Sequence, residues 1–254
     1  FAMFIGLVYL TYAQKEFSDY AFWKGWENFS GKRMKETWRL GFPIALAHAM
    51  EVGMFSAAAL IVGLLGVNAL AAHQIALQST TLSFMIPLGI SQAVSVKVGE
   101  CFGQNNINLS TSALKSGLFL ASVSALFAGA FFLFAPEVLV DFFLPSDTMD
   151  SANYQELLMV ATGILFVAAL FQFVDAWQVI LMGALRGFKL GQSPTMVAIF
   201  SYWCVGIPCS YFASKIWGAP GVWMGMGLGL GLCAILLGLL FKHQLKKQSL
   251  KLSA

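Results

Sequence analysis

Uncharged stretches dominate this chain of 254 residues and indicate its class. Five runs contain no Asp, Glu, Lys or Arg: 52–96, 116–135, 157–174, 190–214 and 216–241. A run of about 18 or more largely apolar residues is typical of a helix that crosses a lipid bilayer. Because such runs recur along the whole chain, the pattern predicts an all-α integral membrane protein.

Short turns divide this apolar pattern into six predicted transmembrane helices. Two of these turns are "GVN" at 66–68 and "GAPG" at 218–221. We therefore expect a six-transmembrane-helix bundle, with helices at about 40–65, 71–97, 113–135, 156–183, 192–214 and 219–242.

The segments outside the bundle complete the predicted organisation. Residues 1–13 are apolar but too short to span a bilayer about 30 Å thick, so we expect the end of a truncated transmembrane helix. Residues 14–38 are polar and aromatic and are predicted to form a cytoplasmic linker. The bundle then occupies 39–243, and 244–254 are predicted to form a cytoplasmic tail.

Composition agrees with this class, and the placement of basic residues predicts the topology. Charged residues make up 11% of the chain and hydrophobic residues 58%, whereas soluble domains are roughly 25% charged. Basic residues favour the cytoplasmic side of the membrane. In the predicted topology Lys215 lies alone on one side, and the other side holds Lys15, Lys24, Lys32, Arg33, Lys35, Arg39, Lys97, Lys115, Arg186, Lys189, Lys242, Lys246, Lys247 and Lys251. We expect a multi-pass protein of the plasma or inner membrane, with linker and C-terminus in the cytoplasm.

Motifs for enzymatic chemistry are missing from the sequence. The four cysteines form no CxxC pair, HExxH is absent, and no Ser/His or Cys/His constellation is visible. The glycines of "GMGLGLG" at 225–231 fit close helix packing better than nucleotide binding. We predict a protein that is not an enzyme, needs no cofactor and binds lipid rather than nucleic acid.

Two acidic residues, Glu51 and Asp175, lie deep inside predicted spans. Glu51 follows Arg39 by 12 residues, and Asp175 precedes Arg186 by 11. At ~1.5 Å per residue, both carboxyl groups lie roughly 16–18 Å from the same end of their helices, near the bilayer midplane. Placing an acid there costs about 2.5–3.5 kcal/mol on insertion scales, and neither has a Lys or Arg within one helical turn.

This cost leaves two interpretations of the acids. The pair could exchange a proton, or hold Na⁺ when deprotonated, and so act as a cation-coupling site. Alternatively, each could be a neutral acid that hydrogen-bonds to a neighbouring helix. The matching depth of Glu51 and Asp175 favours the first interpretation.

Polar and aromatic residues on the same spans are candidates for a cavity lining. His48 lies three residues before Glu51, on the same helical face, but too few ligands accompany it for a transition-metal site. Gln74 and Gln78 would form a polar wall on the second span, although interhelical hydrogen bonding is an equal alternative. An adaptable apolar lining for organic cations, or simple packing, is indicated by Met85, Phe171, Phe173 and Trp177.

Four segments together resemble the multidrug and toxic compound extrusion (MATE) family of transporters. They are "LGFPIALAHAMEVGMF", "AAHQIALQSTTLSFMIPLGISQAVSVKVGECFG", "FQFVDAWQVILMGALRG" and "SYWCVGIPCSYF", within a match that runs from about residue 38 to 242. Members of this family have twelve spans in two six-helix lobes. The resemblance implies that this chain is the C-terminal lobe, that 14–38 are the interlobe linker, and that the N-terminal lobe is missing from it.

The resemblance also implies a function and assigns residues to it. It implies export of amphipathic, often cationic compounds, driven by Na⁺ or H⁺ through alternating access. Glu51 and Asp175 fall at the family's acids in the seventh and tenth helices, and Gln74 falls at a polar cavity position of the eighth. Phe171 replaces a Tyr that some relatives use near their Na⁺ site, which leaves H⁺ more open.

Two other readings remain at this point. A lipid-linked saccharide flippase of a related superfamily branch would favour a wide basic cavity, which these spans do not predict. An inactive or assembly-only half-transporter would agree with the absence of a second lobe, but the acids at matching depth count against it.

Overall fold

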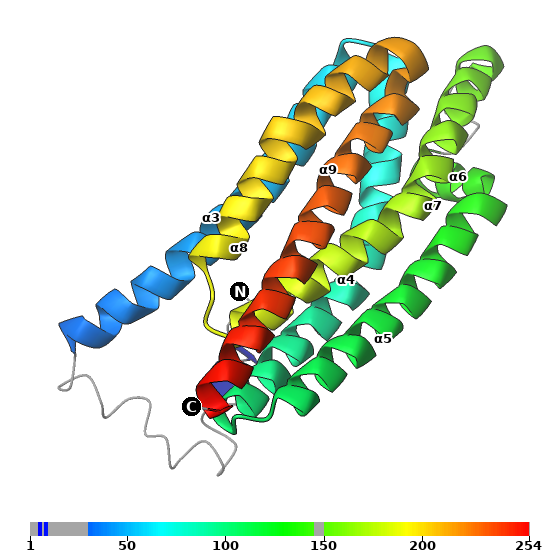
Figure 1. Cartoon of the computed structure of the whole chain (residues 1–254). Coiled ribbons are helices and arrows are strands. Elements are labelled where there is room, and N and C mark those ends of the chain that lie inside the picture. The colour runs from blue at the N-terminus through cyan, green and yellow to red at the C-terminus, as the bar shows by residue number, and fades with distance from the viewer. Residues whose placement is uncertain (1–4, 7, 10–29, 145–149, 254) are drawn as a thin grey trace. The chain divides into compact units, whose positions relative to one another are not determined.

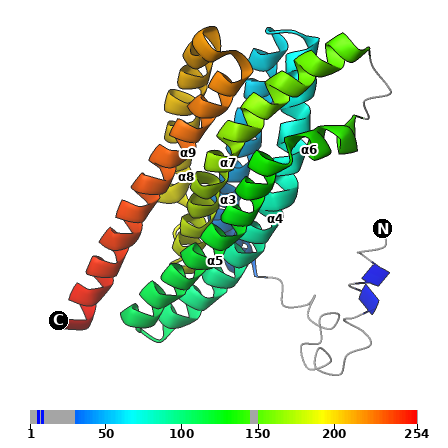
Figure 2. The same ribbon diagram turned by 90° about the vertical axis from the view of Figure 1, so that its right-hand side faces the viewer.

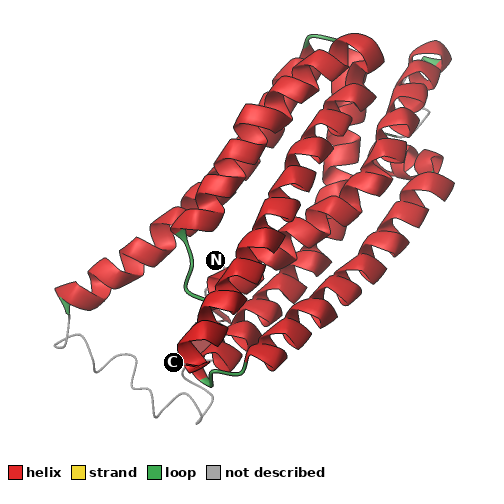
Figure 3. Cartoon of the chain, viewed as in Figure 1, coloured by secondary structure: helices red, strands yellow, loops and turns green. Residues whose placement is uncertain are grey.

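A computed structural model describes residues 5–6, 8–9, 30–144 and 150–253, and this described part is helical without strands (Figure 3). The long helices are α3 (Gly31–Gly63), α4 (Val67–Gly103), α5 (Ile107–Phe134), α7 (Ser151–Gly187) and α9 (Ile207–Ser253). Shorter elements are α6 (Pro136–Phe143), α8 (Gln192–Ile199) and the π-helix η3 (Phe200–Gly206). Most of the predicted 1–13 helix end and of the 14–38 linker lies outside the described residues.

Five helical stretches of the described chain are long and apolar enough to cross a membrane. The last of them, Gln192–Leu250, is in fact two spans, because Gly218 has non-helical backbone angles (φ 62°, ψ −141°) and bends the chain there. Glycine tolerates this left-handed φ because it has no Cβ. The bend lies inside the predicted "GAPG" turn, so the all-α membrane bundle predicted from hydropathy is confirmed.

The helices are longer than the predicted spans, and one helix was not predicted. Helix α4 continues to Gly103, past the charged Lys97 and Glu100, because hydropathy marks the bilayer core and not the helix end. Helix α6 lies in the connection that the sequence left without structure. It begins with Pro136 in its first turn, where the missing N–H of proline costs nothing.

Helix α7 is the centre of the unit formed by Leu40–Ala254. It packs against α4, α5 and α9, as the ribbon shows in both views (Figures 1 and 2). Its buried side chains include Gln172, Asp175 and Gln178 beside many apolar residues. A helix buried on several sides within a membrane bundle can carry acids only where they face other protein groups or a cavity.

Glycines of the "GMGLGLG" segment divide into two pairs by what they touch. A Cβ on Gly225 would lie 2.2 Å from the Ser210 backbone nitrogen, and one on Gly229 would lie 2.7 Å from Gly206 Cα. On Gly227 it would lie 3.6 Å from a Phe171 ring carbon, which is an ordinary contact. The 225/229 spacing therefore brings the two halves of the Gln192–Leu250 hairpin into backbone contact.

We predict that Gly225→Ala and Gly229→Ala each destabilise the folded protein by about 1–3 kcal/mol, because the added methyl group overlaps backbone atoms that cannot move aside. Gly227→Ala is the matched control and should cost less than about 1 kcal/mol. Thermal unfolding of the purified variants in detergent measures the difference. Equal losses in all three variants would contradict this packing arrangement.

Candidate cation and substrate site

Glu51 and Asp175 line one pocket of about 300 Å³ between α3, α4 and α7. Helix α3 supplies Glu51 and helix α7 supplies Asp175, so the two acids come from segments more than a hundred residues apart. The complete lining is His48, Glu51, Val52, Phe55, Leu77, Thr80, Thr81, Phe84, Phe171 and Asp175. The pocket is therefore largely apolar, with two carboxyl groups and two hydroxyl groups in its wall.

The Asp175 carboxyl group is buried without a partner for one of its oxygens. The residue is 5% exposed, and its Oδ1 accepts no hydrogen bond from any residue that the structure describes. A buried polar atom in this state loses its hydration without compensation. The alternative interpretation, in which the acid is hydrogen-bonded to a neighbouring helix, finds no support at Oδ1.

Glu51 differs from Asp175 in its surroundings. Its side chain is 14% exposed, and its Oε2 lies 3.4 Å from Nδ1 of His48, one turn earlier on the same face of α3. Two further contacts place this part of α3: Thr195 Oγ1 donates to the Pro43 carbonyl at 2.7 Å, and Trp203 Nε1 donates to the Met50 carbonyl at 3.3 Å. Both partners lie on the α8–η3 segment, which thereby fixes the depth of Glu51.

A second, smaller cavity adjoins Glu51, and Asp175 is not among the residues that line it. It has room for about one water molecule (10 Å³), and Glu51 and His48 are the residues it shares with the larger pocket. Its remaining lining comes from α3, α7 and the α8–η3 segment: Ile44, Ala47, Gln178, Val179, Met182, Arg186, Leu190, Gly191, Thr195 and Tyr202.

An aromatic stack forms the wall of the larger pocket behind Phe171. The Phe171 ring meets Phe55 edge-on at 6.2 Å between centroids and Trp223 at 5.3 Å. Trp223 Nε1 in turn donates to Nδ1 of His73 at 3.1 Å, and both side chains are fully buried. The stack fixes the position of Phe171 one helical turn from Asp175.

Five predicted lining residues lie outside the pocket that holds the acids. Gln74, Gln78 and Met85 are exposed along α4, and Phe173 is half-buried on α7. Trp177 is 48% exposed and donates its Nε1 to Ser122 Oγ of α5 at 2.8 Å. A role of these five residues in a cavity lining stays a prediction, whereas His48, Glu51, Phe171 and Asp175 do share one pocket.

Sequence reasoning missed several groups that the fold brings to this region. Trp223, Arg186 and Tyr202 are distant from Glu51 in sequence and carried no local signal, and Gln178 was also missed. Gln172 was also missed. It lies three residues before Asp175 on α7, is buried, and donates through Nε2 to Ser83 Oγ of α4. An amide in an apolar run is the signal that could have identified Gln172 and Gln178.

Metal binding finds little support beyond the two acids. Within the described ranges, no group of three or more His, Cys, Asp or Glu residues is placed to hold a metal ion. Na⁺ bound by Glu51 and Asp175 would need further oxygen ligands, of which Thr80 and Thr81 line the pocket. Both hydroxyl groups already donate to the Leu77 carbonyl.

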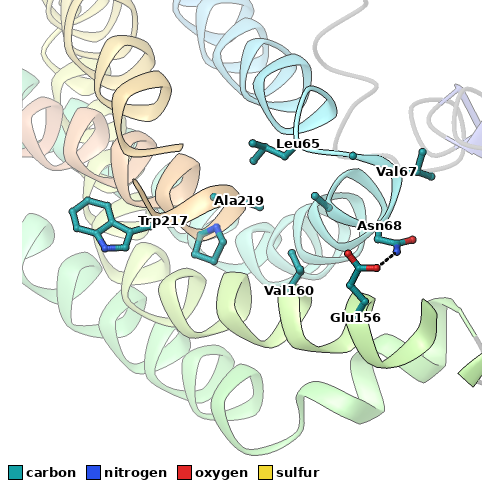
Figure 4. Close-up of a pocket in the computed structure, with 11 residues that line it drawn as sticks. Leu65, Val67, Asn68, Glu156, Val160, Trp217 and Ala219 are labelled. Atoms are coloured by element: carbon teal, nitrogen blue, oxygen red, sulfur yellow. Dashed lines mark hydrogen bonds between the residues drawn. The ribbon is translucent and has the colours of Figure 1, made fainter. Parts of the chain in front are cut away.

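Another hollow, of about 490 Å³, lies beside the α3–α4 turn and the Gly218 bend (Figure 4). Asn68 Nδ2 donates to Glu156 Oε2 at 2.7 Å across it, linking α4 to α7. Gly66 and Gly218, both at positive φ, form the turns that border it. The hollow has a single acid, and neither deep carboxyl group reaches it, so we do not assign the coupling site there.

The bundle and its buried acids together define a polytopic α-helical membrane protein. Comparison with known proteins gives the family. Residues 43–212 match the MatE family model, and the chain belongs to the MatE family.

Curated relatives agree with this assignment. The chain is 38% identical over 229 residues to a "Probable multidrug resistance protein NorM" of Pseudomonas syringae pv. tomato, covering 89% of this chain and 49% of the relative. It is 38% identical over 232 residues to the protein of that name in Pseudomonas aeruginosa, covering 90% and 47%. The chain thus spans about half the length of the curated relatives it matches.

Solved structures support the same fold. The chain superposes on the "eukaryotic MATE transporter AtDTX14" with a TM-score of 0.79 and 22% identity, over 95% of this chain and 53% of that one. A "MATE in the bent conformation" gives a TM-score of 0.77 at 19% identity, over 89% and 49%.

Proposed function

We propose that this chain is the C-terminal lobe of a secondary active exporter of amphipathic organic cations, coupled to an inward flux of H⁺ or Na⁺. The observation that carries the proposal is the pocket that Glu51 and Asp175 share. An acid at this depth is costly and marks an ion or substrate pathway by default. The names of the curated relatives, which are multidrug resistance proteins, supply the substrate class.

The chemistry of the pocket fits a coupling mechanism. Binding of H⁺ or Na⁺ neutralises negative charge in an apolar cavity, which weakens its attraction for an organic cation and releases the cargo. Deprotonated carboxyl groups beside Phe55, Phe84 and Phe171 offer charge and aromatic faces to the next cation. H⁺ needs fewer ligands than Na⁺ does. Because Phe171 contributes no hydroxyl group as a ligand, the pocket suits H⁺ better than Na⁺.

Transport also requires a second lobe, because alternating access moves one repeat against another around a central site. We infer that the exposed side chains of α4, including Gln74, Gln78 and Met85, face that lobe across the central cavity. The excess of basic residues supports an orientation with the Arg186 end of α7 and the C-terminus on the cytoplasmic side of the cell membrane.

Inverted membrane vesicles that contain the full-length protein test this function. We expect an imposed proton or Na⁺ gradient to drive ethidium accumulation above that of vesicles without the protein. The response to each gradient alone identifies the coupling ion. Ethidium accumulation that is the same with and without each gradient would reject the proposal of cation antiport.

A further inference from the structure

Arg186 reaches far back along α7 toward the middle of the bundle. Its Nη2 donates to Ser91 Oγ at 3.2 Å, and Ser91 Oγ donates to the Val179 carbonyl at 2.7 Å. Val179 precedes Arg186 by seven residues, or roughly 10 Å of helix at ~1.5 Å per residue. The guanidinium group is therefore far deeper than its backbone, as expected for a side chain directed toward the N-terminus of its helix.

Packing of α4 on α7 leaves room for this arrangement. A Cβ on Gly183 would lie 2.5 Å from the Ser91 carbonyl oxygen, so glycine lets the two backbones meet there. This close approach places Ser91 beside the guanidinium group and fixes the side chain in the interior. A positive charge predicted at the end of a span is instead held within it.

Arg186 and Glu51 line the same small cavity, and Asp175 does not. Arg186 Nε is buried and donates to no residue in the described part of the chain. Gln178 also lines this cavity, is 2% exposed, and has an Oε1 that accepts no hydrogen bond from the described residues. A cavity the size of one water molecule thus has an unsatisfied donor, an unsatisfied acceptor and a carboxyl group in its wall.

We propose that Arg186 is the counter-charge of Glu51 and that it acts across this cavity through a water molecule held by Gln178. A buried carboxylate and a guanidinium group stabilise each other only if their remaining polar atoms are satisfied, and the bridging water supplies those bonds. Glu51 thus has a guanidinium partner on α7 in addition to His48 on its own helix. Asp175 lines the larger pocket, whose described lining includes His48 but no Lys or Arg.

The pairing gives the two acids different tasks, and this part rests on the proposed function. Arg186 holds the Glu51 carboxyl group between transport events, so a cation that binds Glu51 must compete with the guanidinium group. Asp175 has no such competitor and is the acid that exchanges the coupling ion. Arg186 is therefore a positioning residue that tunes the attraction of the pocket for cargo.

A double-mutant cycle on the thermal unfolding of the full-length protein in detergent tests the pairing without any transport assay. Arg186→Met should lower the Tm, because it leaves Glu51 without its counter-charge. Adding Glu51→Gln should restore about half or more of that loss, since the uncompensated charge is then gone. The matched cycle of Arg186→Met with Asp175→Asn should be additive.

The outcomes separate this pairing from a purely structural role. If Arg186 only supports Ser91 and the α4–α7 contact, Glu51→Gln will restore nothing, and the proposal is overturned. Should Arg186→Met fail to fold, Arg186→Gln removes the charge but keeps an N–H donor for Ser91, and it replaces Arg186→Met in both cycles, with the same pattern expected. Folding of the Arg186→Met, Glu51→Gln protein where the single variant fails would support the pairing.

Ethidium binding provides a second readout that distinguishes the pairing from the function. Loss of the competing guanidinium group should tighten ethidium binding to Arg186→Met, seen as a lower Kd by fluorescence. Coupling in the stability cycle without any ethidium binding would support the pair and reject the function. Weaker binding in a folded Arg186→Met protein would reject the competition between Arg186 and cargo.

Discussion

Asp175→Asn should abolish gradient-driven ethidium transport, and Glu51→Gln should abolish it or nearly so. An amide has almost the same shape as a carboxyl group but neither binds a proton near neutral pH nor carries the charge that attracts Na⁺ or an organic cation. Because Asp175 Oδ1 has no hydrogen-bond partner in the described structure, the amide should fold into the same pocket. The expected loss is therefore one of coupling, with the protein still present in the membrane.

Inverted vesicles with an imposed proton or Na⁺ gradient measure this loss. Asp150→Asn and Glu100→Gln are matched controls, because they make the same chemical changes at exposed positions and should leave transport unchanged. Detergent-extracted Asp175→Asn and the two controls should also show Tm values within about 2–4 °C of the unmodified protein, whereas Glu51→Gln should have a lower Tm because it leaves Arg186 without its counter-charge. Normal coupled transport by both Asp175→Asn and Glu51→Gln would reduce the acids to structural groups and move the coupling site out of this lobe.

Trp223→Ala should be the most destabilising single substitution among those considered, at about 3–5 kcal/mol. The indole is fully buried, donates its N–H to His73 and supports Phe171 at the pocket wall. Its removal leaves a cavity at the junction of α4, α7 and α9. It also leaves His73 without its one hydrogen bond, because the remaining Nε2 has no partner in the described residues.

Thermal unfolding in detergent distinguishes these two losses. Trp223→Phe keeps most of the volume and should cost about 1–3 kcal/mol, mainly the unsatisfied Nδ1 of His73. Trp217→Ala is the matched control on the same helix, since that indole is 57% exposed, and its effect should be within about 0.5 kcal/mol. A Trp223→Ala protein as stable as Trp217→Ala would show that the stack does not support the bundle.

Hydropathy was sufficient for the architecture because the bilayer imposes one local rule on every span. Apolar runs must be helical to satisfy their own backbone groups, so their number, order and type follow from the sequence. The shared pocket of Glu51 and Asp175 also agrees with the depth that residue counting gave them. Hydropathy predicted the helix ends less well, since α4 continues through charged residues into the headgroup region.

The direction in which each helical face points was the part of the site that the sequence could not predict. Residues two apart on a helix point about 200° from each other, so Trp177 faces α5 while Asp175 faces the pocket. Periodicity shows that these faces differ but not which neighbour covers each one. The exposed Gln74 and Gln78 illustrate the same problem, because this lobe alone does not cover them.

By itself the sequence determined that this is an all-helical membrane protein with two costly acids at one depth. Tertiary structure decided what surrounds them: Phe171 and its stack beside Asp175, and Arg186 in the cavity of Glu51. The physical reason is range. Hydrophobic burial and helix propagation act between neighbours in sequence, whereas the partner of a buried charge comes from another helix, 135 residues away for Glu51 and Arg186, and is fixed only when the helices pack.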